Sequence, residues 1–136
     1  MTKKYVDGLS RQIIGAAIEV HKIIGPGQLE SIYHASMMEE LRLRGLRFVS
    51  EKPILINYKG KILEKDMRCD LFVEDCITTE LKATLEFTPV NIAQTLSYMH
   101  FLGSPKGILI NFNCTNIFKE GQKTLVNKLY EALPDE

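Results

Sequence analysis

Hydrophobic positions near the start of the chain recur at the spacing of an amphipathic helix. Within residues 9–24, one stripe of a 3.6-residue period holds Ile13, Ile14, Ala17, Ile18 and His21. The Gly-Pro-Gly sequence at Gly25–Gly27 is expected to end this helix. A second helix is predicted from residue 28 to Arg44, with Gly45 as its C-terminal cap. The chain therefore opens with two helices.

Apolar and alternating runs predict strands in the middle of the chain. Residues 48–58 and 61–73 read as two strands joined by a turn at Lys59–Gly60, and Ile77–Ala83 reads as a third. Residues 106–113, KGILINFN, are continuously apolar, which is typical of a strand buried on both faces.

Three helix signals agree between the last two of these strands. Thr88 is a good N-cap, Pro89 suits the first helical position, and Gly103 follows the end. The expected packing stripe of this helix contains Val90, Ala93, Leu96 and Met99 or His100. The tail from Gly121 to Leu133 is also expected to be helical.

The resulting order is two helices, three strands, a helix and a strand, followed by the tail. A chain of 136 residues with 45% hydrophobic residues can bury a core, and it predicts a single α/β domain over residues 1–136. The step from Ile77 through the helix to Asn113 should be a right-handed parallel crossover.

Composition narrows the functional classes. Seventeen basic residues balance seventeen acidic ones, so a nucleic acid would have to bind to a local basic patch. The three cysteines form no CxxC pair, and no signal peptide is evident, which predicts a reducing, cytoplasmic location. No apolar run reaches the roughly 20 residues that span a bilayer, so no membrane partner is expected.

The predicted strand faces place charged residues together. The apolar odd positions are Met67, Cys69, Leu71 and Val73 in one strand and Ile77, Leu81 and Ala83 in the next, with Thr79 among them. The even positions then bring Asp70, Glu80 and Lys82 onto the opposite face. A three-residue loop at Glu74–Cys76 would set Asp70 opposite Glu80, with the Cβ atoms about 5 Å apart.

Two carboxylates at that separation destabilise a sheet unless something compensates their charge. A divalent cation would do so, and Lys82 alone is the simpler compensation. The alternative is that Glu80 and Lys82 form a solvated ion pair on an exposed strand and that Asp70 is incidental.

Two helical pairs add candidate side chains. Glu30 and Tyr33 are one turn apart and share a face, although Glu30 also complements the dipole of its helix. Gln94 and Tyr98 share a face of the third helix, beside its apolar stripe, where they could hydrogen-bond to and stack on a nucleotide.

Taken in order, these residues resemble the GxxExxY proteins of the PD-(D/E)XK nuclease-like superfamily. The matching motifs are Gly27-x-x-Glu30-x-x-Tyr33, Asp70, Glu80-Leu81-Lys82-Ala83, Gln94-x-x-x-Tyr98 and LINFN, within about residues 9–115. The resemblance implies a restriction-endonuclease-like αβββαβ core, with a mixed sheet flanked by helices. Cys69 stands where the superfamily has its eponymous proline, and Thr79 replaces a commonly apolar residue.

The resemblance also implies roles for the site residues. Asp70 and Glu80 would be catalytic metal-binding carboxylates, joined at the metal by Glu30 and the carbonyl of Leu81, and Lys82 would be the catalytic lysine. Gln94 and Tyr98 match the Q-x-x-x-Y motif of the RecB-like branch, and together with Tyr33 they are predicted to lie near nucleic acid.

The chemistry predicted from these roles is metal-dependent hydrolysis of phosphodiester bonds in DNA, or in RNA. Mg²⁺ or Mn²⁺ suits a site of carboxylate and carbonyl oxygens. One alternative is a catalytically silent nuclease fold that binds nucleic acid or a protein. Another is a subunit that acts as a homo-oligomer or beside a helicase or defence protein. A small-molecule nucleotide hydrolase has the least support, because the chain has no Gly-rich phosphate loop.

Overall fold

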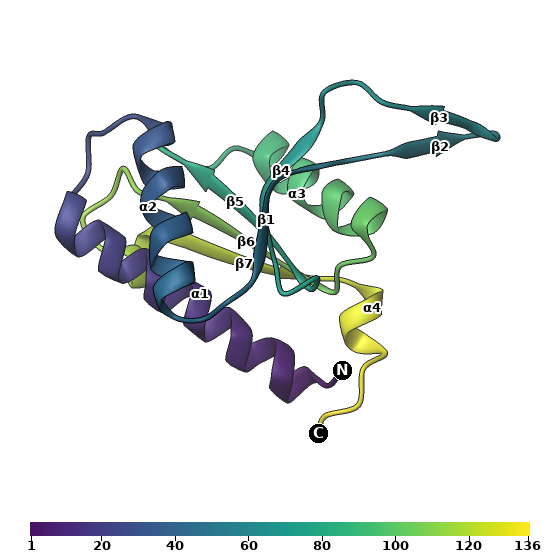
Figure 1. Cartoon of the computed structure of the whole chain (residues 1–136), viewed down its shortest axis with the longest axis horizontal. Helices are drawn as coiled ribbons and strands as arrows, with labels where there is room; N and C mark the ends of the chain where they lie inside the picture. The colour runs from purple at the N-terminus through teal and green to yellow at the C-terminus, as the bar shows by residue number, and fades with distance from the viewer.

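The computed structural model describes residues 1–136 as a mixed α/β domain (Figure 1). The helices are α1 (Lys3–Ile24), α2 (Glu30–Leu43), α3 (Pro89–Leu102) and α4 (Lys128–Glu131), and η1 (Ile117–Gly121) is a π-helical turn. The strands are β1 (Phe48–Pro53), β2 (Ile56–Tyr58), β3 (Lys61–Leu63), β4 (Arg68–Val73), β5 (Ile77–Lys82), β6 (Lys106–Asn111) and β7 (Gln122–Val126).

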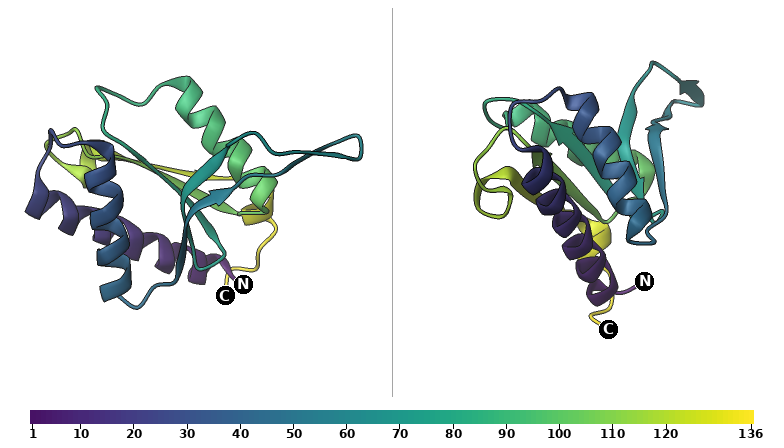
Figure 2. Two further views of the ribbon diagram at one scale, coloured as in Figure 1. Left: turned by 45° about the horizontal axis from the view of Figure 1, so that its top comes forward. Right: turned by 60° about the vertical axis from the view of Figure 1, so that its left-hand side comes forward.

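A five-stranded sheet with the order β1-β4-β5-β6-β7 forms the centre of the molecule. Strands β5 and β6 are parallel and the other neighbours are antiparallel, so the mixed sheet and the parallel crossover through α3 are confirmed. Figures 1 and 2 show α1 and α2 on one face of the sheet and α3 on the other. None of the helices combines the length and the apolar character needed to cross a membrane.

Apolar residues fill both interfaces between the sheet and the helices. The larger cluster joins α1 and α2 to the apolar side chains of β4, β5 and β6. A smaller cluster, which we call the α3-side cluster, consists of Ile54, Cys69, Phe72 and Tyr98. Because β6 is buried along its whole length, the prediction of a strand covered on both faces is confirmed.

The two long strands predicted over residues 48–58 and 61–73 are each divided. Their outer parts, β2 and β3, leave the main sheet and pair only with each other. The division falls after Pro53, whose nitrogen has no proton to donate to a ladder. The backbone N–H of Ile54 still donates to the carbonyl of Met67, at 2.8 Å, and closes the base of the two-stranded ribbon.

The prediction of a helical tail over residues 121–133 is wrong. Residues 122–126 form β7, which pairs antiparallel with β6, and only four residues of α4 are helical. Strand β6 would otherwise leave its backbone groups unpaired on one edge, and pairing with β7 satisfies them. Tertiary pairing therefore overrides the local preference of the tail.

The packing stripe predicted for α3 is confirmed at Met99 and wrong at its other positions. Its buried side chains are Thr95, Tyr98 and Met99, whereas Val90 is 73% exposed. The helix packs closely against Gly107 of β6: the sulfur of Met99 lies 2.6 Å from where a Cβ on Gly107 would stand. A glycine in the neighbouring strand thus decides which face of α3 is buried.

Candidate active site

The hairpin of β4 and β5 has the predicted loop. Val73 pairs with Ile77 and Leu71 with Thr79, so Glu74–Cys76 is the three-residue connection between the strands. Continued by one position, this register places Asp70 opposite Glu80. The backbone ladder ends at the Leu71–Thr79 pair, and the two acidic residues lie where the strands part.

Side-chain carboxylates replace the missing ladder bonds at this position. The backbone N–H of Asp70 donates to Oε2 of Glu80 at 2.9 Å, and the N–H of Leu81 donates to Oδ2 of Asp70 at 2.8 Å. The backbone of β4 therefore holds one oxygen of Glu80, and the backbone of β5 holds one oxygen of Asp70. This reciprocal arrangement orients both acids without help from other side chains.

Glu80 is almost completely buried, with 3% of its surface exposed. The pKa of its carboxyl group is raised to about 8, first by burial and second by the negative charge of Asp70, and the positive charge of Lys82 offsets only part of this rise. The ammonium group of Lys82 has no carboxylate oxygen within 4.0 Å and so forms no ion pair. The interpretation of Glu80 and Lys82 as a solvated ion pair is therefore wrong.

The strict alternation predicted for the strand faces breaks at Asp70. Cys69 lies in the α3-side cluster with Phe72, whereas Leu71 belongs to the larger cluster against α1 and α2. The corresponding residue of β1 is Glu51, whose φ of 52° lies in the left-handed region. Both strands are thus irregular at the level of the two acids, a position at which strained backbone often accompanies function.

A hollow of about 440 Å³ opens on the α2 side of this break. Its polar lining includes Glu30, His34, Ser50, Glu51 and Asp70. Glu30 is the first residue of α2, so the helix brings it to the same hollow as Asp70. No three His, Cys, Asp or Glu side chains converge closely enough to hold a metal ion, however. The structure therefore joins Asp70 and Glu80 and leaves Glu30 apart from them.

Two residues that line the hollow, His34 and Glu51, were not predicted from the sequence to belong to the site. His34 lies one turn after Glu30, with its Nε2 2.8 Å from Oγ of Ser50. Glu51 faces the hollow because of its left-handed backbone. The spacing of Glu30 and His34 was a usable signal, whereas nothing in the local sequence predicts the conformation of Glu51.

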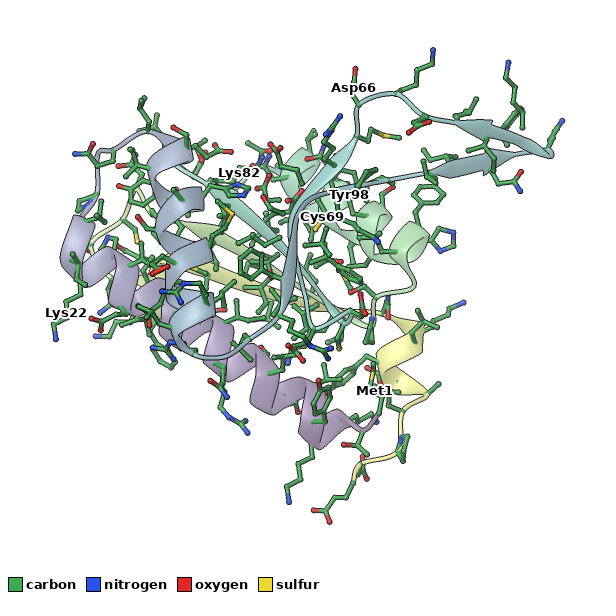
Figure 3. All side chains as sticks on the ribbon, viewed as in Figure 1. Met1, Lys22, Asp66, Cys69, Lys82 and Tyr98 are labelled. Carbon is green, nitrogen blue, oxygen red and sulfur yellow. The ribbon has the colours of Figure 1, made fainter.

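Lys82 ends β5, and its position depends on the neighbouring strand. It pairs with Asn111 of β6, and its carbonyl accepts the N–H of Phe112 at 2.9 Å. The buried amide of Asn111 accepts from the N–H of Thr84 at 3.1 Å and donates to the carbonyl of Thr84 at 2.9 Å. The LINFN segment thus anchors the chain directly after Lys82, the last residue of the central strand β5, which is labelled in Figure 3.

The prediction that Tyr33 contacts nucleic acid is wrong, because its side chain is 0% exposed. Its hydroxyl donates to the carbonyl of Gly25 at 2.6 Å and accepts the N–H of Gln28 at 3.1 Å. Its ring stacks on Phe112 with centroids 4.4 Å apart. Tyr33 instead ties the Gly-Pro-Gly loop to the core and so sets where α2, and with it Glu30, begins.

Tyr98 approaches the site from α3. Only 6% of it is exposed, so its ring cannot stack on a nucleotide as the sequence analysis allowed. Burial raises the pKa of its hydroxyl, and the charges of Glu80 and Asp70 raise it further. Gln94, one turn earlier, is exposed at the surface.

The carbonyl of Leu81 points toward the gap between the strands. In a strand, the N–H and C=O of one residue point to the same side, and the N–H of Leu81 is directed at Asp70. Because the ladder with β4 has ended here, this carbonyl lies on the side of β5 where Asp70 is held and has no paired strand opposite it.

A family model of the PD-(D/E)XK nuclease superfamily matches residues 7–125. The chain belongs to this superfamily. The match to the PD-(D/E)XK nucleases runs from α1 into β7 and includes every predicted site residue. No curated protein and no solved structure is significantly similar to the chain.

PD-(D/E)XK nucleases typically use divalent metals. The residues of this chain fit such an ion: the buried Glu80 lies beside the half-buried Asp70, and one oxygen of each acid is left without a backbone donor. The carbonyl of Leu81 adds a third hard oxygen, of the kind that Mg²⁺ and Mn²⁺ prefer. A cation would also offset the repulsion that raises the pKa of Glu80.

Proposed function

We propose that this protein is a metal-dependent nuclease that hydrolyses phosphodiester bonds of DNA. The observation that carries the proposal is the buried Glu80 carboxylate directly beside Asp70, at the point where β4 and β5 separate. Burying an acid beside a second acid is costly, and an enzyme that binds a cation there has a reason to keep both. Membership of the nuclease superfamily supports the same chemistry.

In this proposal Asp70, Glu80 and the Leu81 carbonyl would hold Mg²⁺ or Mn²⁺, and Glu30 would complete the acidic lining from α2. The ion supplies a more acidic bound water and a positive charge at the scissile phosphate. Lys82, which has no ion-pair partner, would orient the attacking water or neutralise negative charge developing on the phosphate.

Two side chains of α3 would support this centre. Tyr98 is held in the α3-side cluster together with Cys69, the residue directly before Asp70, and from there it would brace the acids. Gln94 is exposed one turn away and would contact the nucleic-acid strand. The Gln94-x-x-x-Tyr98 spacing and the Gly27-x-x-Glu30-x-x-Tyr33 motif support assignment to the RecB-like branch and to the GxxExxY family.

The direct test is cleavage of single- and double-stranded DNA and of RNA with Mg²⁺ or Mn²⁺. The wild-type protein should cleave DNA, and Asp70→Asn should abolish cleavage while the protein remains folded. Lys22→Ala, which changes an exposed lysine at the far end of α1, serves as the control and should cleave normally (Figure 3). Full activity in Asp70→Asn would end the proposal.

A catalytically silent nuclease fold is the second candidate, and one observation favours it. Only two of the three predicted acidic side chains are adjacent, and both are already held by backbone N–H groups. Metal binding separates the two cases. If Mn²⁺ raises the melting temperature of wild type and not of Glu80→Gln, the site binds metal and the enzyme is supported. If neither protein responds to Mn²⁺, the silent fold is favoured.

A protein partner, whether a second copy or a helicase or defence protein, and a cytoplasmic location complete the proposal. Exposed apolar side chains between α1 and α2, among them Ile23 and Leu43, offer a surface on which to test association. Light scattering should show an oligomer that Leu43→Glu disperses; a monomer at all concentrations would exclude the second copy as the partner.

A further inference from the structure

The two-stranded ribbon of β2 and β3 projects from the body of the protein (Figures 1 and 2). We call residues 54–67 the arm. Its strands are in register from Ile56–Leu63 to Tyr58–Lys61, and Lys59 and Gly60 form its tip. At about 3.3 Å per residue, the arm reaches on the order of 20 Å from its base.

The arm has little structural role within the domain. Only side chains at its base contribute to the core: Ile54 belongs to the α3-side cluster, and Ile56 and Met67 pack against that cluster. Further out, Tyr58 is 61% exposed and Ile62 is 55% exposed. A two-stranded ribbon is marginally stable by itself, so an exposed one that the core does not need suggests a surface that binds something.

Basic residues are concentrated in the arm and its flanks, although the whole chain has no net charge. Residues 52–68 contain five basic residues, Lys52, Lys59, Lys61, Lys65 and Arg68, and two acidic ones, Glu64 and Asp66, a net charge of +3. The rest of the chain has twelve basic and fifteen acidic residues, a net charge of −3. Of the five basic side chains, only Arg68 forms an ion pair, with Asp66 at 3.7 Å.

The base of the arm is continuous with the candidate active site. Strand β4 starts at Arg68, and Asp70 follows two residues later. A polymer held along the arm would therefore pass close to the acids.

We propose that the arm binds double-stranded DNA by entering its major groove, and so presents a strand to the site; this inference rests on the proposed nuclease function. The strands of a ribbon lie 4.7–4.9 Å apart, and the B-form major groove, about 12 Å wide, admits a two-stranded ribbon. Lys59, Lys61 and Lys65 would contact the phosphates that border the groove. Double-stranded RNA is a poor fit, because its major groove is deep and narrow.

The pattern of side chains favours DNA over a protein partner. Tyr58 pairs with Lys61, and Ile62 pairs with Asn57, so neither face of the arm is uniformly apolar. The Lys59 ammonium lies 5.6 Å from the ring centroid of Tyr58, which keeps positive charge at the tip. Such a mixed, basic surface is better suited to binding a polyanion than to binding the apolar groove of a protein partner.

The test measures binding apart from cleavage. The triple variant Lys59→Ala/Lys61→Ala/Lys65→Ala is compared with Lys22→Ala/Lys119→Ala/Lys123→Ala, which removes the same charge from exposed lysines elsewhere. Fluorescence anisotropy in EDTA reports the binding of a DNA duplex of about two helical turns, the matching single strand and the matching RNA duplex.

Loss of three phosphate contacts should make the slope of log K against log salt shallower by about 2.7, and should weaken duplex DNA binding on the order of 100-fold at physiological salt. The control triple variant should keep the wild-type slope, and the loss should be smaller for single-stranded DNA and RNA duplex. Equal losses in both triple variants, or equal losses on all three nucleic acids, would overturn the proposal. A change of oligomeric state with unaltered DNA binding would do the same and point to a protein partner.

Failure of the nuclease proposal would look different. Arm-dependent DNA binding without cleavage under any metal would leave the arm as a DNA-binding element on a silent fold. Suppose instead that Asp70→Asn loses cleavage, whereas the arm variant cleaves and binds duplex DNA like the wild type. That result would support the nuclease proposal and contradict the role of the arm in DNA binding.

Discussion

Glu80→Gln should stabilise the metal-free protein at alkaline pH. In the wild type, the folded state keeps a proton on the buried Glu80 carboxyl group, whose pKa is raised to about 8 from an ordinary value of 4.5. The unfolded chain releases this proton at lower pH. Because the folded state binds the extra proton, its stability falls as the pH rises between these two values. Glutamine keeps the acceptor oxygen for the N–H of Asp70 and carries no charge.

The magnitude follows from the size of the pKa difference. Each pKa unit corresponds to about 1.36 kcal/mol, so the rise from 4.5 to about 8 costs the wild type on the order of 5 kcal/mol above pH 8. The carboxyl group is 3% exposed, so solvent screens little of this penalty. Typical domains have only 5–15 kcal/mol of stability, so the difference should be easy to measure.

Urea denaturation in EDTA, at mildly acidic and at alkaline pH, measures this difference. The wild type should lose several kcal/mol between the two conditions, and Glu80→Gln should lose much less. Glu131→Gln, which changes an exposed carboxylate of α4, should behave like the wild type. Adding Mn²⁺ at alkaline pH should restore the stability of the wild type and leave Glu80→Gln unchanged.

Parallel pH profiles for wild type and Glu80→Gln would refute this reasoning, since the penalty would then not reside in the Glu80 carboxyl group. Restoration of stability by Mn²⁺ in both proteins would show that the ion binds elsewhere, for example among the other acids of the hollow.

Three further substitutions test separate parts of the structure. Lys82→Ala should abolish cleavage and leave Mn²⁺ binding intact, as judged by thermal shift; cleavage at the wild-type rate would remove Lys82 from the mechanism. Tyr33→Phe should lower the free energy of unfolding by about 1 kcal/mol through loss of the hydrogen bond to Gly25, with DNA affinity unchanged; a selective loss of affinity would restore its role as a contact. Asn111→Ala should cost about 2 kcal/mol and slow cleavage, because Thr84 loses two hydrogen bonds beside Lys82; unchanged stability and activity would contradict the anchoring role.

The register of the β4–β5 hairpin shows where sequence reasoning succeeds. Side chains alternate along a strand, and a three-residue loop fixes which residues face each other, so Asp70 and Glu80 could be paired from the sequence. Their hydrogen bonds to backbone N–H groups could not, because these depend on the ladder ending one residue earlier.

The wrong predictions share one cause: a partner distant in the chain decided the outcome. The tail became β7 because β6 offered an unpaired edge, and α3 buries Thr95 in place of Leu96 because Gly107 leaves room for Thr95 beside Met99. Tyr33 fitted a motif for function, yet the ring of Phe112 and the carbonyl of Gly25 hold it in the core. Spacing within one helix carries no record of such contacts.

The sequence alone determined the mixed α/β order and the hairpin register that sets Asp70 opposite Glu80, because these follow from periodicities and turns local to the chain. Only the tertiary structure decided that Glu80 is buried and that the ribbon of β2 and β3 leaves the sheet. It also decided that Glu30 lines the same hollow as Asp70 without joining Asp70 and Glu80 in a metal-binding cluster. Burial of a side chain and the meeting of side chains from different elements depend on which elements pack together. The pKa of Glu80 depends on both, and the charge of Glu80 governs whether a cation is held.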